Sequence, residues 1–261
     1  LDLLLLEREV GRDDLVLEVG SGTGGLTSRL AQLAGGVLSV EIDGDFANLV
    51  RELMDEAENV ILHRGDILRN KNELNADVLK ILNDLLMQSG LANLKLIANL
   101  PYSVATAVIT NFLLIDLPIE RMVVTVQWEI AERLSSNPSS KEYGALAVLV
   151  QSLADVTVVR RLPPSVFWPK PKVDSGIVMI KPNAEKRAHV GDPLQFRQFL
   201  RELYIHKRKN LRGALASIPF LKMKKSEIDE KLEELKLEGT IRAETLTLEQ
   251  HLTLSRTFAW S

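Results

Sequence analysis

The four residues Asn99-Leu-Pro-Tyr102 bring together an amide, a rigid turn and an aromatic ring. That combination suits methylation of an exocyclic amine such as N6 of adenine, whose lone pair is delocalised into the ring. We expect the Asn99 side-chain oxygen and a main-chain carbonyl near Pro101 to accept its two N–H bonds, while Tyr102 stacks on the base. Proline fixes the loop, and acceptors already in place act without reorganising during the reaction. In isolation, the same residues also fit an ordinary proline turn.

A glycine-rich segment, residues 18–27, follows a strand-like run and opens a helical pattern. Glycines there allow a tight turn and a close approach of the backbone to a ligand. Gly20, Gly22 and Gly25 fit the dinucleotide pattern G-x-G-x-x-G. Gly20, Gly22 and Gly24 fit the G-x-G-x-G loop that is common in methyltransferases. The loop therefore predicts a nucleoside-containing ligand, either NAD or S-adenosylmethionine.

Two acidic positions after the next strands are typical of an adenosine site. Glu41 ends the second strand-like run, where a carboxylate can accept hydrogen bonds from both ribose hydroxyls. Asp66 follows the third run, and we expect it either to accept the adenine amino group or to cap a turn. Ile42 and Ile67 are expected to pack on the faces of the adenine ring. Because NAD and S-adenosylmethionine share an adenosine, these positions do not separate the two.

Short apolar runs alternate with helical patterns along the chain. Strands are predicted at 15–19, 37–41, 60–62, 94–98 and 122–126, with a late antiparallel pair at 156–160 and 177–180. Helices are predicted at 26–33, 46–57, 78–87, 104–114, 194–203, 211–216 and 228–237. Asp43 and Asp45 are expected to begin the second helix rather than to bind a ligand. The repetition predicts an α/β fold with a mostly parallel, Rossmann-like sheet and helices on both faces.

The polar stretch 182–193 holds two prolines and a glycine, and we place a domain boundary within it. An α/β domain is predicted over 1–184 and a smaller all-helical domain over 185–261. The chain has no cysteine, which excludes disulfides and thiolate metal sites, and we expect no metal. No apolar run approaches the roughly 20 residues of a membrane span. Without a signal peptide, the protein is expected in the cytoplasm.

Charge is distributed unevenly along the 261 residues. The net charge of −3 argues by itself against binding to nucleic acid. Between Lys181 and Lys225, however, twelve Lys or Arg stand against three Asp or Glu, whereas residues 226–261 hold four basic and eight acidic side chains. One basic block in an acidic chain predicts a directed electrostatic contact, and a solvated helix face is the alternative interpretation.

These motifs together resemble the ribosomal RNA adenine dimethyltransferases that act on two adjacent adenines near the 3′ end of small-subunit rRNA. The resemblance covers nearly the whole chain. Its motifs are VLEVGSGTGGLT (16–27), VEID (40–43), GDIL (65–68), NLPYSVAT (99–106), SSKEYGALAV (139–148), PPSVFWPKPKVDSGIV (163–178) and HKRKNLRGAL (206–215). The pair NLPY and FWPKPKVDS is highly specific, whereas the glycine loop alone is weak.

The resemblance implies a class I methyltransferase sheet and S-adenosylmethionine as the methyl donor. Gly20 and its loop would contact the methionine part, Glu41 the ribose and Asp66 the adenine. Asn99 would contact both the cofactor and the target amine. Phe167 would stack on the extruded base opposite Tyr102, although packing within a proline-rich loop also explains an aromatic residue there.

The same resemblance implies a cationic surface for RNA and an immature small ribosomal subunit as the partner of a monomeric enzyme. The candidate cations are Arg160, Arg161, Lys170, Lys172, Lys207, Arg208, Lys209 and Arg212. Two features depart from the family pattern. Family members carry an upstream segment with a Gln-Asn-Phe-Leu-like stretch that closes over the cofactor, and this sequence begins after it, so we expect native residues before Leu1. Ser103 stands where the family usually has Asn, which we expect to be tolerated because methyl transfer depends on Asn99.

Three alternatives stay open at this point. The large-subunit rRNA adenine dimethyltransferases of the macrolide-resistance type share the glycine loop and a similar NxPY motif, but Leu100 and the long basic C-terminal region favour the small-subunit group. A non-catalytic factor for transcription or ribosome assembly would not need the intact NLPY. A dehydrogenase that uses NAD is supported by the glycine loop alone.

Overall fold

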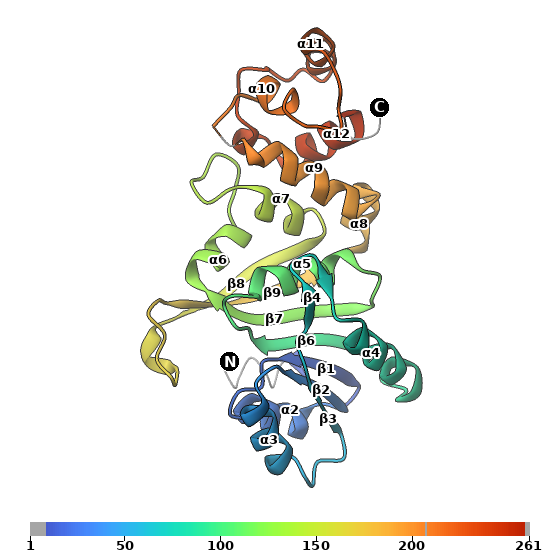
Figure 1. Ribbon diagram of the computed structural model, residues 1–261, viewed down its shortest axis with the longest axis vertical. Helices are drawn as coiled ribbons and strands as arrows, with labels where there is room; N and C mark the ends of the chain where they lie inside the picture. Colours follow the sequence, from blue (N-terminus) through green and yellow to red (C-terminus); the bar gives the residue numbers. More distant parts are fainter. Residues whose placement is uncertain (1–8, 207, 259–261) are drawn as a thin grey trace. The chain divides into compact units, whose positions relative to one another are not determined.

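A computed structural model describes residues 9–206 and 208–258 of the chain (Figure 1). The strands are β1 (Asp14–Val19), β2 (Gly36–Glu41), β3 (Val60–Arg64), β4 (Leu68–Asn70), β5 (Glu73–Leu74), β6 (Asn93–Asn99), β7 (Ile119–Gln127), β8 (Ala154–Leu162) and β9 (Ser175–Pro182). The helices are α2 (Gly25–Leu33), α3 (Gly44–Leu53), α4 (Ala76–Gln88), α5 (Ala105–Leu114), α6 (Trp128–Leu134), α7 (Ala145–Gln151), α8 (Ala184–Val190), α9 (Pro193–Ile205), α10 (Leu211–Leu215), α11 (Lys225–Glu234) and α12 (Leu248–Phe258), with single 3₁₀ turns at Pro164–Val166 and Ala243–Thr245.

The main sheet has the strand order β3-β2-β1-β6-β7-β9-β8. Strands β3, β2, β1, β6 and β7 are parallel, and β9 runs antiparallel to β7. This arrangement confirms the predicted α/β class, with a mostly parallel sheet that ends in antiparallel strands. The short strands β4 and β5 form a separate hairpin that the sequence analysis did not predict.

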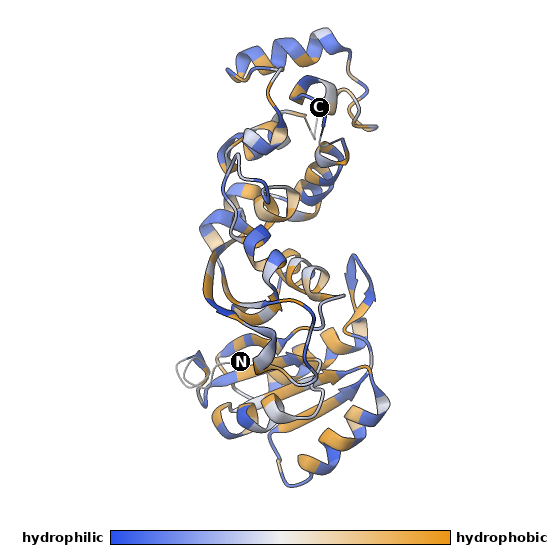
Figure 2. Ribbon diagram, turned by 90° about the vertical axis from the view of Figure 1, so that its left-hand side faces the viewer, coloured by the Kyte–Doolittle hydropathy of each residue, from blue (hydrophilic) through white to orange (hydrophobic). Residues whose placement is uncertain are grey.

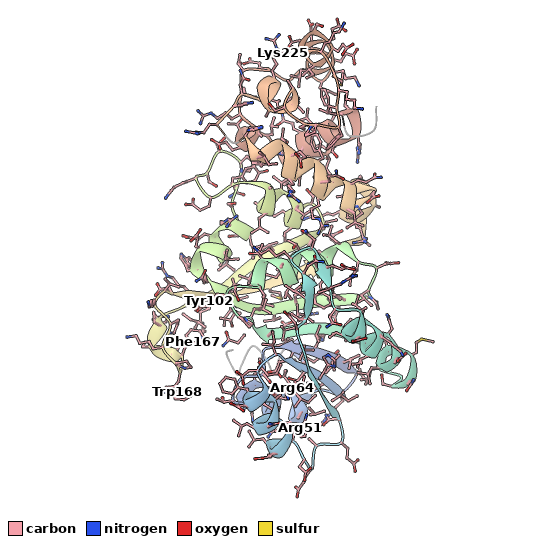
Figure 3. The ribbon with its side chains drawn as sticks, viewed as in Figure 1. Arg51, Arg64, Tyr102, Phe167, Trp168 and Lys225 are labelled. Atoms are coloured by element: carbon pink, nitrogen blue, oxygen red, sulfur yellow. The ribbon has the colours of Figure 1, made fainter. Side chains whose placement is uncertain are left out.

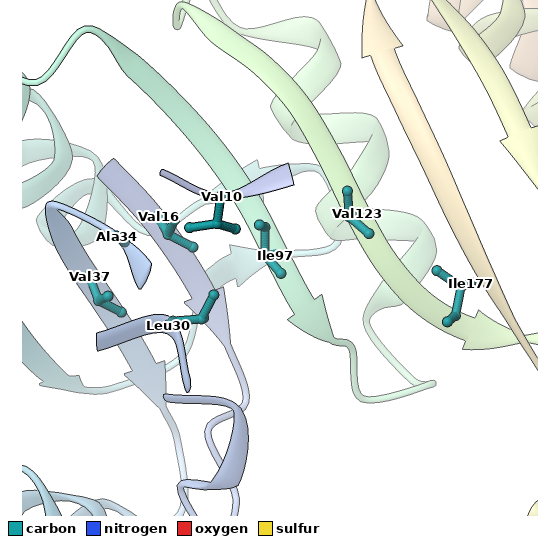
Figure 4. Packing of buried hydrophobic residues seen from close by; sticks show 8 residues of the cluster. All are labelled: Val10, Val16, Leu30, Ala34, Val37, Ile97, Val123 and Ile177. Atoms are coloured by element: carbon teal, nitrogen blue, oxygen red, sulfur yellow. The ribbon is translucent and has the colours of Figure 1, made fainter. Parts of the chain in front are cut away.

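The core forms on both faces of the sheet because its central strands are buried along almost their whole length. Every residue of β1 is buried, which requires cover above and below the strand. One cluster runs across the strands from Val37 through Val16 and Ile97 to Val123, and Leu30 of α2 closes it (Figure 4). Coloured by hydropathy, the strands of this region are largely apolar, while the helices alternate apolar and polar residues (Figure 2).

The strand order places two loops next to each other at one edge of the sheet. β1 lies between β2 and β6, so the chain leaves β1 toward one side and leaves β6 toward the other. Ligands of open parallel sheets bind at such a switch point, beyond the carboxyl ends of the strands. The glycine loop follows β1 and the Asn99 loop follows β6.

Several helices lie where the sequence analysis expected none, namely α6, α7, α8 and α12. Helix α8 occupies part of the polar stretch 182–193, within which the domain boundary is predicted. It begins where the side chain of Asn183 accepts a hydrogen bond from the Lys186 N–H, and it ends at Gly191, whose φ is 80°. A capping asparagine and a terminating glycine are the physical reasons for this short helix.

The chain divides into two compact units. One comprises the residues up to Ala131 and Thr157–Pro182, and the other comprises Glu132–Val156 and the residues from Asn183 on. In the second unit, which is helical, α7 packs against α9 and α12. The predicted boundary between residues 184 and 185 lies close to the point after Pro182 where the chain passes from the first unit to the second. The prediction places residues 132–156 in the first domain, whereas they group with the second unit. None of the described helices is long and apolar enough to cross a membrane.

Candidate functional site

The glycine loop turns sharply because its glycines adopt backbone angles that other residues rarely adopt. Gly20 has a φ of 79° and Gly24 a φ of 80°. The Gly20 N–H donates to the Val40 carbonyl at 2.8 Å, which ties the loop to the end of β2. A Cβ on Gly20 would lie 3.1 Å from two ring carbons of Pro101. Only a glycine allows the two loops to meet this closely, and the glycine loop and the Asn99 loop therefore form one site.

Glu41 is buried at the end of β2 and holds the glycine loop from the other side. Its Oε2 accepts the Gly22 N–H at 2.8 Å and the Ser21 hydroxyl at 3.3 Å. Its Oε1 accepts the Asp43 N–H at 2.9 Å. A carboxylate has about four acceptor positions, so these bonds fix its orientation and still leave it able to accept hydrogen bonds from a ligand. Ile42 follows it and is 64% exposed, with its side chain open to a binding partner.

The two aspartates near the adenosine positions act on the local backbone. The Asp43 carboxylate accepts the N–H groups of Asp45 and Phe46, which confirms its expected place at the start of α3. Asp66 is exposed, and its Oδ1 accepts the Leu68 N–H at 2.9 Å. The turn-capping interpretation of Asp66 is thus observed, and its second carboxylate oxygen remains open for a ligand. Ile67 beside it is buried.

Glu18 lies beneath the glycine loop, and the sequence analysis gave it no role. Its side chain is fully buried, and its Oε2 accepts hydrogen bonds from the Thr27 hydroxyl at 2.7 Å and the Ser39 hydroxyl at 2.6 Å. Its Oε1 has no hydrogen-bond partner among the described residues. Burial raises the pKa of Glu18 from 4.5 to about 7; the hydroxyls of Ser39 and Thr27 lower it, and the charge of Glu41 raises it. An acid inside the apolar strand LVLEV was the signal in the sequence.

The Asn99 loop is fixed by its own backbone. The Leu100 N–H donates to the Thr125 carbonyl at 3.2 Å, and the Leu100 side chain is buried. The Pro101 carbonyl accepts the N–H groups of Val104 and Ala105, both at 3.1 Å, and so starts α5. The main-chain acceptor expected near Pro101 is therefore better supplied by the carbonyl of Leu100. The Asn99 side chain is exposed at the end of β6.

A cavity of about 240 Å³ opens beside Asn99, and its wall is aromatic and proline-rich. The lining residues are Asn99, Leu100, Pro101, Tyr102, Phe167, Trp168, Pro169 and Pro171. The Tyr102 hydroxyl bonds to the Ser175 hydroxyl at 2.7 Å, which fixes the plane of the ring. Phe167 is half-buried on the loop between β8 and β9, and Figure 3 shows it with Tyr102 and Trp168. The structure thus brings Asn99, Tyr102 and Phe167 to one cavity.

Some of the cations predicted to contact RNA bond to other side chains of the protein, and others are exposed to solvent. Arg161 bonds to Asp174, with N–O distances of 2.6 and 2.8 Å, and its guanidinium lies 4.6 Å from the centre of the Trp128 ring. Arg160 on the same strand and Lys170 and Lys172 on the following loop are exposed.

In the helical unit, Arg208 is exposed, Lys209 donates to the Ser217 hydroxyl at 2.7 Å, and Arg212 pairs with Asp229 at 2.5 Å. Lys207 lies outside the described residues. Among the residues that the structure describes, no group of His, Cys, Asp and Glu is arranged to hold a metal ion.

The helical unit contains a buried polar cluster that the sequence analysis did not anticipate. His251 of α12 is fully buried, and its Nε2 lies 3.0 Å from the Tyr204 hydroxyl while its Nδ1 lies 2.8 Å from the Thr247 carbonyl. Its ring stacks on that of Tyr204 at an interplanar angle of 13°, and the edge of Tyr143 approaches it. Burial lowers the pKa of His251 to about 4, so this histidine is neutral in the folded protein near pH 7.

Solved structures of other proteins share the fold of this chain. A dimethyladenosine transferase from Plasmodium falciparum superposes with a TM-score of 0.78 at 24% identity, over 97% of this chain and 92% of that one. The 23S rRNA methyltransferase ErmE superposes with a TM-score of 0.65 at 23% identity, over 98% of this chain and 96% of that one. At these identities the likeness concerns the fold alone, and it confirms the predicted Rossmann-like methyltransferase sheet with additional helices.

Sequence comparison identifies the family. A protein of Lachnoclostridium phytofermentans named ribosomal RNA small subunit methyltransferase A is 34% identical over 256 residues, which cover 98% of this chain and 85% of that protein. A protein of the same name from Pediococcus pentosaceus is 36% identical over 245 residues, covering 92% and 78%. Residues 3–259 match the family described as ribosomal RNA adenine dimethylase. With its glycine loop, Asn99 loop and aromatic cavity in one place, the chain belongs to the ribosomal RNA adenine dimethylase family.

Proposed function

We propose that this enzyme dimethylates N6 of two adjacent adenines near the 3′ end of small-subunit rRNA during assembly of the small ribosomal subunit. The observation that carries the proposal is the close packing of Gly20 against Pro101. It brings the loop that suits a nucleoside cofactor against the loop that carries Asn99, and the aromatic cavity opens from the second loop.

The residues around the glycine loop fit S-adenosylmethionine, the methyl donor of this family. A Cβ on Gly22 would meet nothing within 4 Å, so the loop has open space on that side for a ligand. Glu41 would accept hydrogen bonds from the ribose, and the second carboxylate oxygen of Asp66 would accept the adenine amino group. The exposed Ile42 would pack on one face of the ring, whereas Ile67, expected on the other face, is already buried in the core. When bound there, the cofactor supplies a methyl group made electrophilic by its sulfonium.

Asn99 and Leu100 would prepare the target amine. The Asn99 side-chain oxygen and the Leu100 carbonyl accept the two N–H bonds of N6 and so localise the nitrogen lone pair toward the methyl group. The backbone of both residues is fixed by β6 and the start of α5, so the Leu100 carbonyl need not reorganise as the nitrogen gains positive charge. The proton released after each transfer leaves from N6. After the first transfer one N–H remains, and one of the two acceptors is then sufficient to orient the amine.

The cavity would receive a base that has left its helix. Extruding a base costs a few kcal/mol, and stacking against aromatic side chains offsets part of that cost. Tyr102 offers a ring fixed through Ser175, and Phe167 faces the cavity from the β8–β9 loop. This arrangement positions the base by its faces and its amine by hydrogen bonds, which is consistent with a reaction that depends on alignment rather than on a covalent enzyme intermediate.

The relatives support the small subunit over the large one as the substrate. Relatives at 31–36% identity over nearly the whole chain carry the name ribosomal RNA small subunit methyltransferase A. The exposed cations Arg160, Lys170, Lys172 and Arg208 would bind phosphates of the RNA. Such contacts recognise the shape of the RNA backbone rather than its base sequence. We propose that the enzyme works as a monomer in the cytoplasm, where ribosomal subunits are assembled in bacteria such as those that hold these relatives.

The decisive experiment uses undermethylated small subunits, undermethylated large subunits and labelled S-adenosylmethionine. We expect dimethyladenosine at two adjacent positions of the small-subunit rRNA alone. Methylation confined to the large subunit would contradict the choice of substrate. No methylation of either would contradict the proposal as a whole, provided that calorimetry shows the cofactor bound.

Asn99→Ala is expected to lower the rate of methyl transfer about 10²- to 10³-fold, as removal of a fixed polar group does in other enzymes. Asn72→Ala is the matched control, because Asn72 is an exposed asparagine in the turn between β4 and β5. Circular dichroism should show both variants folded. Full activity of Asn99→Ala would contradict the role of its amide in activating the amine.

A further inference from the structure

Trp168 stands out because a large apolar ring is left in water. It is 86% exposed, and Val166 and Val173 on the same loop are 59% and 45% exposed. Single exposed apolar residues are ordinary, but three on one loop beside a functional cavity form a surface suited to a partner. Nothing in the catalytic scheme above uses Trp168.

The loop that carries Trp168 is held in place rather than loose. Its base is closed by the pair of Arg161 and Asp174, and the Trp128 N–H donates to the Asp174 carbonyl at 2.9 Å. Before Trp168, the Phe167 N–H donates to the Pro164 carbonyl at 3.3 Å, and prolines fix the backbone on both sides. A ring presented by a fixed loop loses little conformational freedom when it binds, which strengthens binding.

Trp168 lies at the rim of the cavity that contains Asn99. It lines that cavity together with Phe167, but Phe167 is half-buried while Trp168 is nearly fully exposed. The backbone at Phe167 is extended, with φ −113° and ψ 148°, so the two successive side chains diverge (Figure 3). A base that enters the cavity beside Phe167 therefore leaves its neighbour in the RNA close to the Trp168 ring.

We propose that Trp168 stacks on the nucleotide next to the target adenine, an inference that rests on the proposed function. Extrusion of the target leaves the neighbouring base with one unstacked face. An aromatic ring can cover such a face whatever the identity of the base. Lys170 and Lys172 follow on the same loop and are exposed, placed to meet the phosphates of that nucleotide. Trp168 is in this view a positioning residue that holds the RNA while Phe167 and Tyr102 hold the target.

The first test compares Trp168→Ala, Trp168→Phe and Met87→Ala with the wild type on undermethylated small subunits. Met87 on α4 is 85% exposed and serves as the control for loss of an exposed apolar side chain. We expect Trp168→Ala to raise the KM for the subunit about 5-fold or more, because stacking of one base contributes about 5- to 150-fold in affinity. Trp168→Phe should restore most of it, and calorimetry should give one cofactor Kd for all four proteins.

The second test identifies the nucleotide by using synthetic RNA of the methylated segment with the base removed on one side of the target. Intact RNA should bind the wild type more tightly than Trp168→Ala. The abasic RNA that lacks the stacked base should bind both proteins with the same Kd. The tryptophan emission that Trp168→Phe lacks should be quenched by intact RNA. If Trp168→Ala behaves as Met87→Ala does, or if neither abasic RNA removes the difference, the stacking role is wrong. Failure of the wild type to methylate would instead refute the proposed function, and the binding and emission measurements would still decide on Trp168.

Discussion

Glu18→Gln tests whether the buried carboxyl beneath the glycine loop is neutral in the folded protein. Burial raises the pKa of Glu18 from 4.5 to about 7, so between these values the folded protein keeps a proton that the unfolded chain has released. The stability that comes from the neutral carboxyl is fully present below pH 4.5, is lost as the pH rises toward 7, and does not return above it.

The size of the effect follows from that window. At about 1.4 kcal/mol per pH unit, the free energy of unfolding should fall by about 3 kcal/mol across it because of Glu18 alone. Glutamine has the same shape, can accept the hydrogen bonds of Thr27 and Ser39, and does not titrate. The difference in stability, variant minus wild type, should therefore rise by about 3 kcal/mol between pH 4.5 and 7.

The assay is denaturant unfolding of the wild type and Glu18→Gln at several pH values, followed by near-ultraviolet circular dichroism. Glu52→Gln, on the exposed surface of α3, controls for the loss of one negative charge. A carbon-13 titration of the Glu18 carboxyl gives its pKa directly. A stability difference that stays constant across the window, or a carboxyl that titrates near 4.5, would show that the buried group is charged and that the reasoning from desolvation is wrong.

Three further predictions concern other parts of the molecule. Gly35→Ala should destabilise the protein by about 1–3 kcal/mol or more, because its Cβ would lie 2.1 Å from the Arg12 carbonyl oxygen. Gly25→Ala is the control, because its Cβ would meet nothing within 4 Å and should leave the stability nearly unchanged. Thermal unfolding of both variants and the wild type measures the difference. Arg208→Ala should weaken RNA binding and reduce the slope of log Kd against log salt by about 1, whereas Lys80→Ala on α4 should leave the slope unchanged. His251, whose pKa is lowered from 6.5 to about 4, contributes stability that is present above pH 6.5 and lost as the pH falls toward 4. His251→Gln should remove up to about 3 kcal/mol of that pH dependence in denaturant titrations.

The sheet could be predicted because buried parallel strands have an unambiguous pattern. The strands β1 and β6 are rich in apolar residues with only single charged positions among them, and β2 ends at the acidic residue Glu41, which is typical of an adenosine site. Helix α7 could not be predicted in the same way, since its sequence ALAVLVQ is apolar almost all round and has no helical period. The β4–β5 hairpin is too short and too polar to give a pattern of its own.

The candidate site could be predicted as residue types but not as contacts. The sequence indicated the glycine loop, Glu41 and Asn99, whose roles stay proposals. It could not indicate that Pro101 packs on Gly20, because that contact depends on the strand order and on the backbone angle of one glycine. Nor could it separate the two carbonyls of the Asn99 loop, since only the hydrogen bonds at the start of α5 show that the Pro101 carbonyl is already engaged.

The interleaving of the two units has a consequence for how this protein can be recombined. β8 begins with Ala154–Val156 in the helical unit and continues from Thr157 in the sheet unit, so the inserted segment Glu132–Val156 enters and leaves through covalent connections to the sheet. A chimera that exchanged only the residues after Pro182 would set α7 of one parent against α9 and α12 of the other. Grafting a different helical unit onto this sheet therefore requires two segments to be transplanted together.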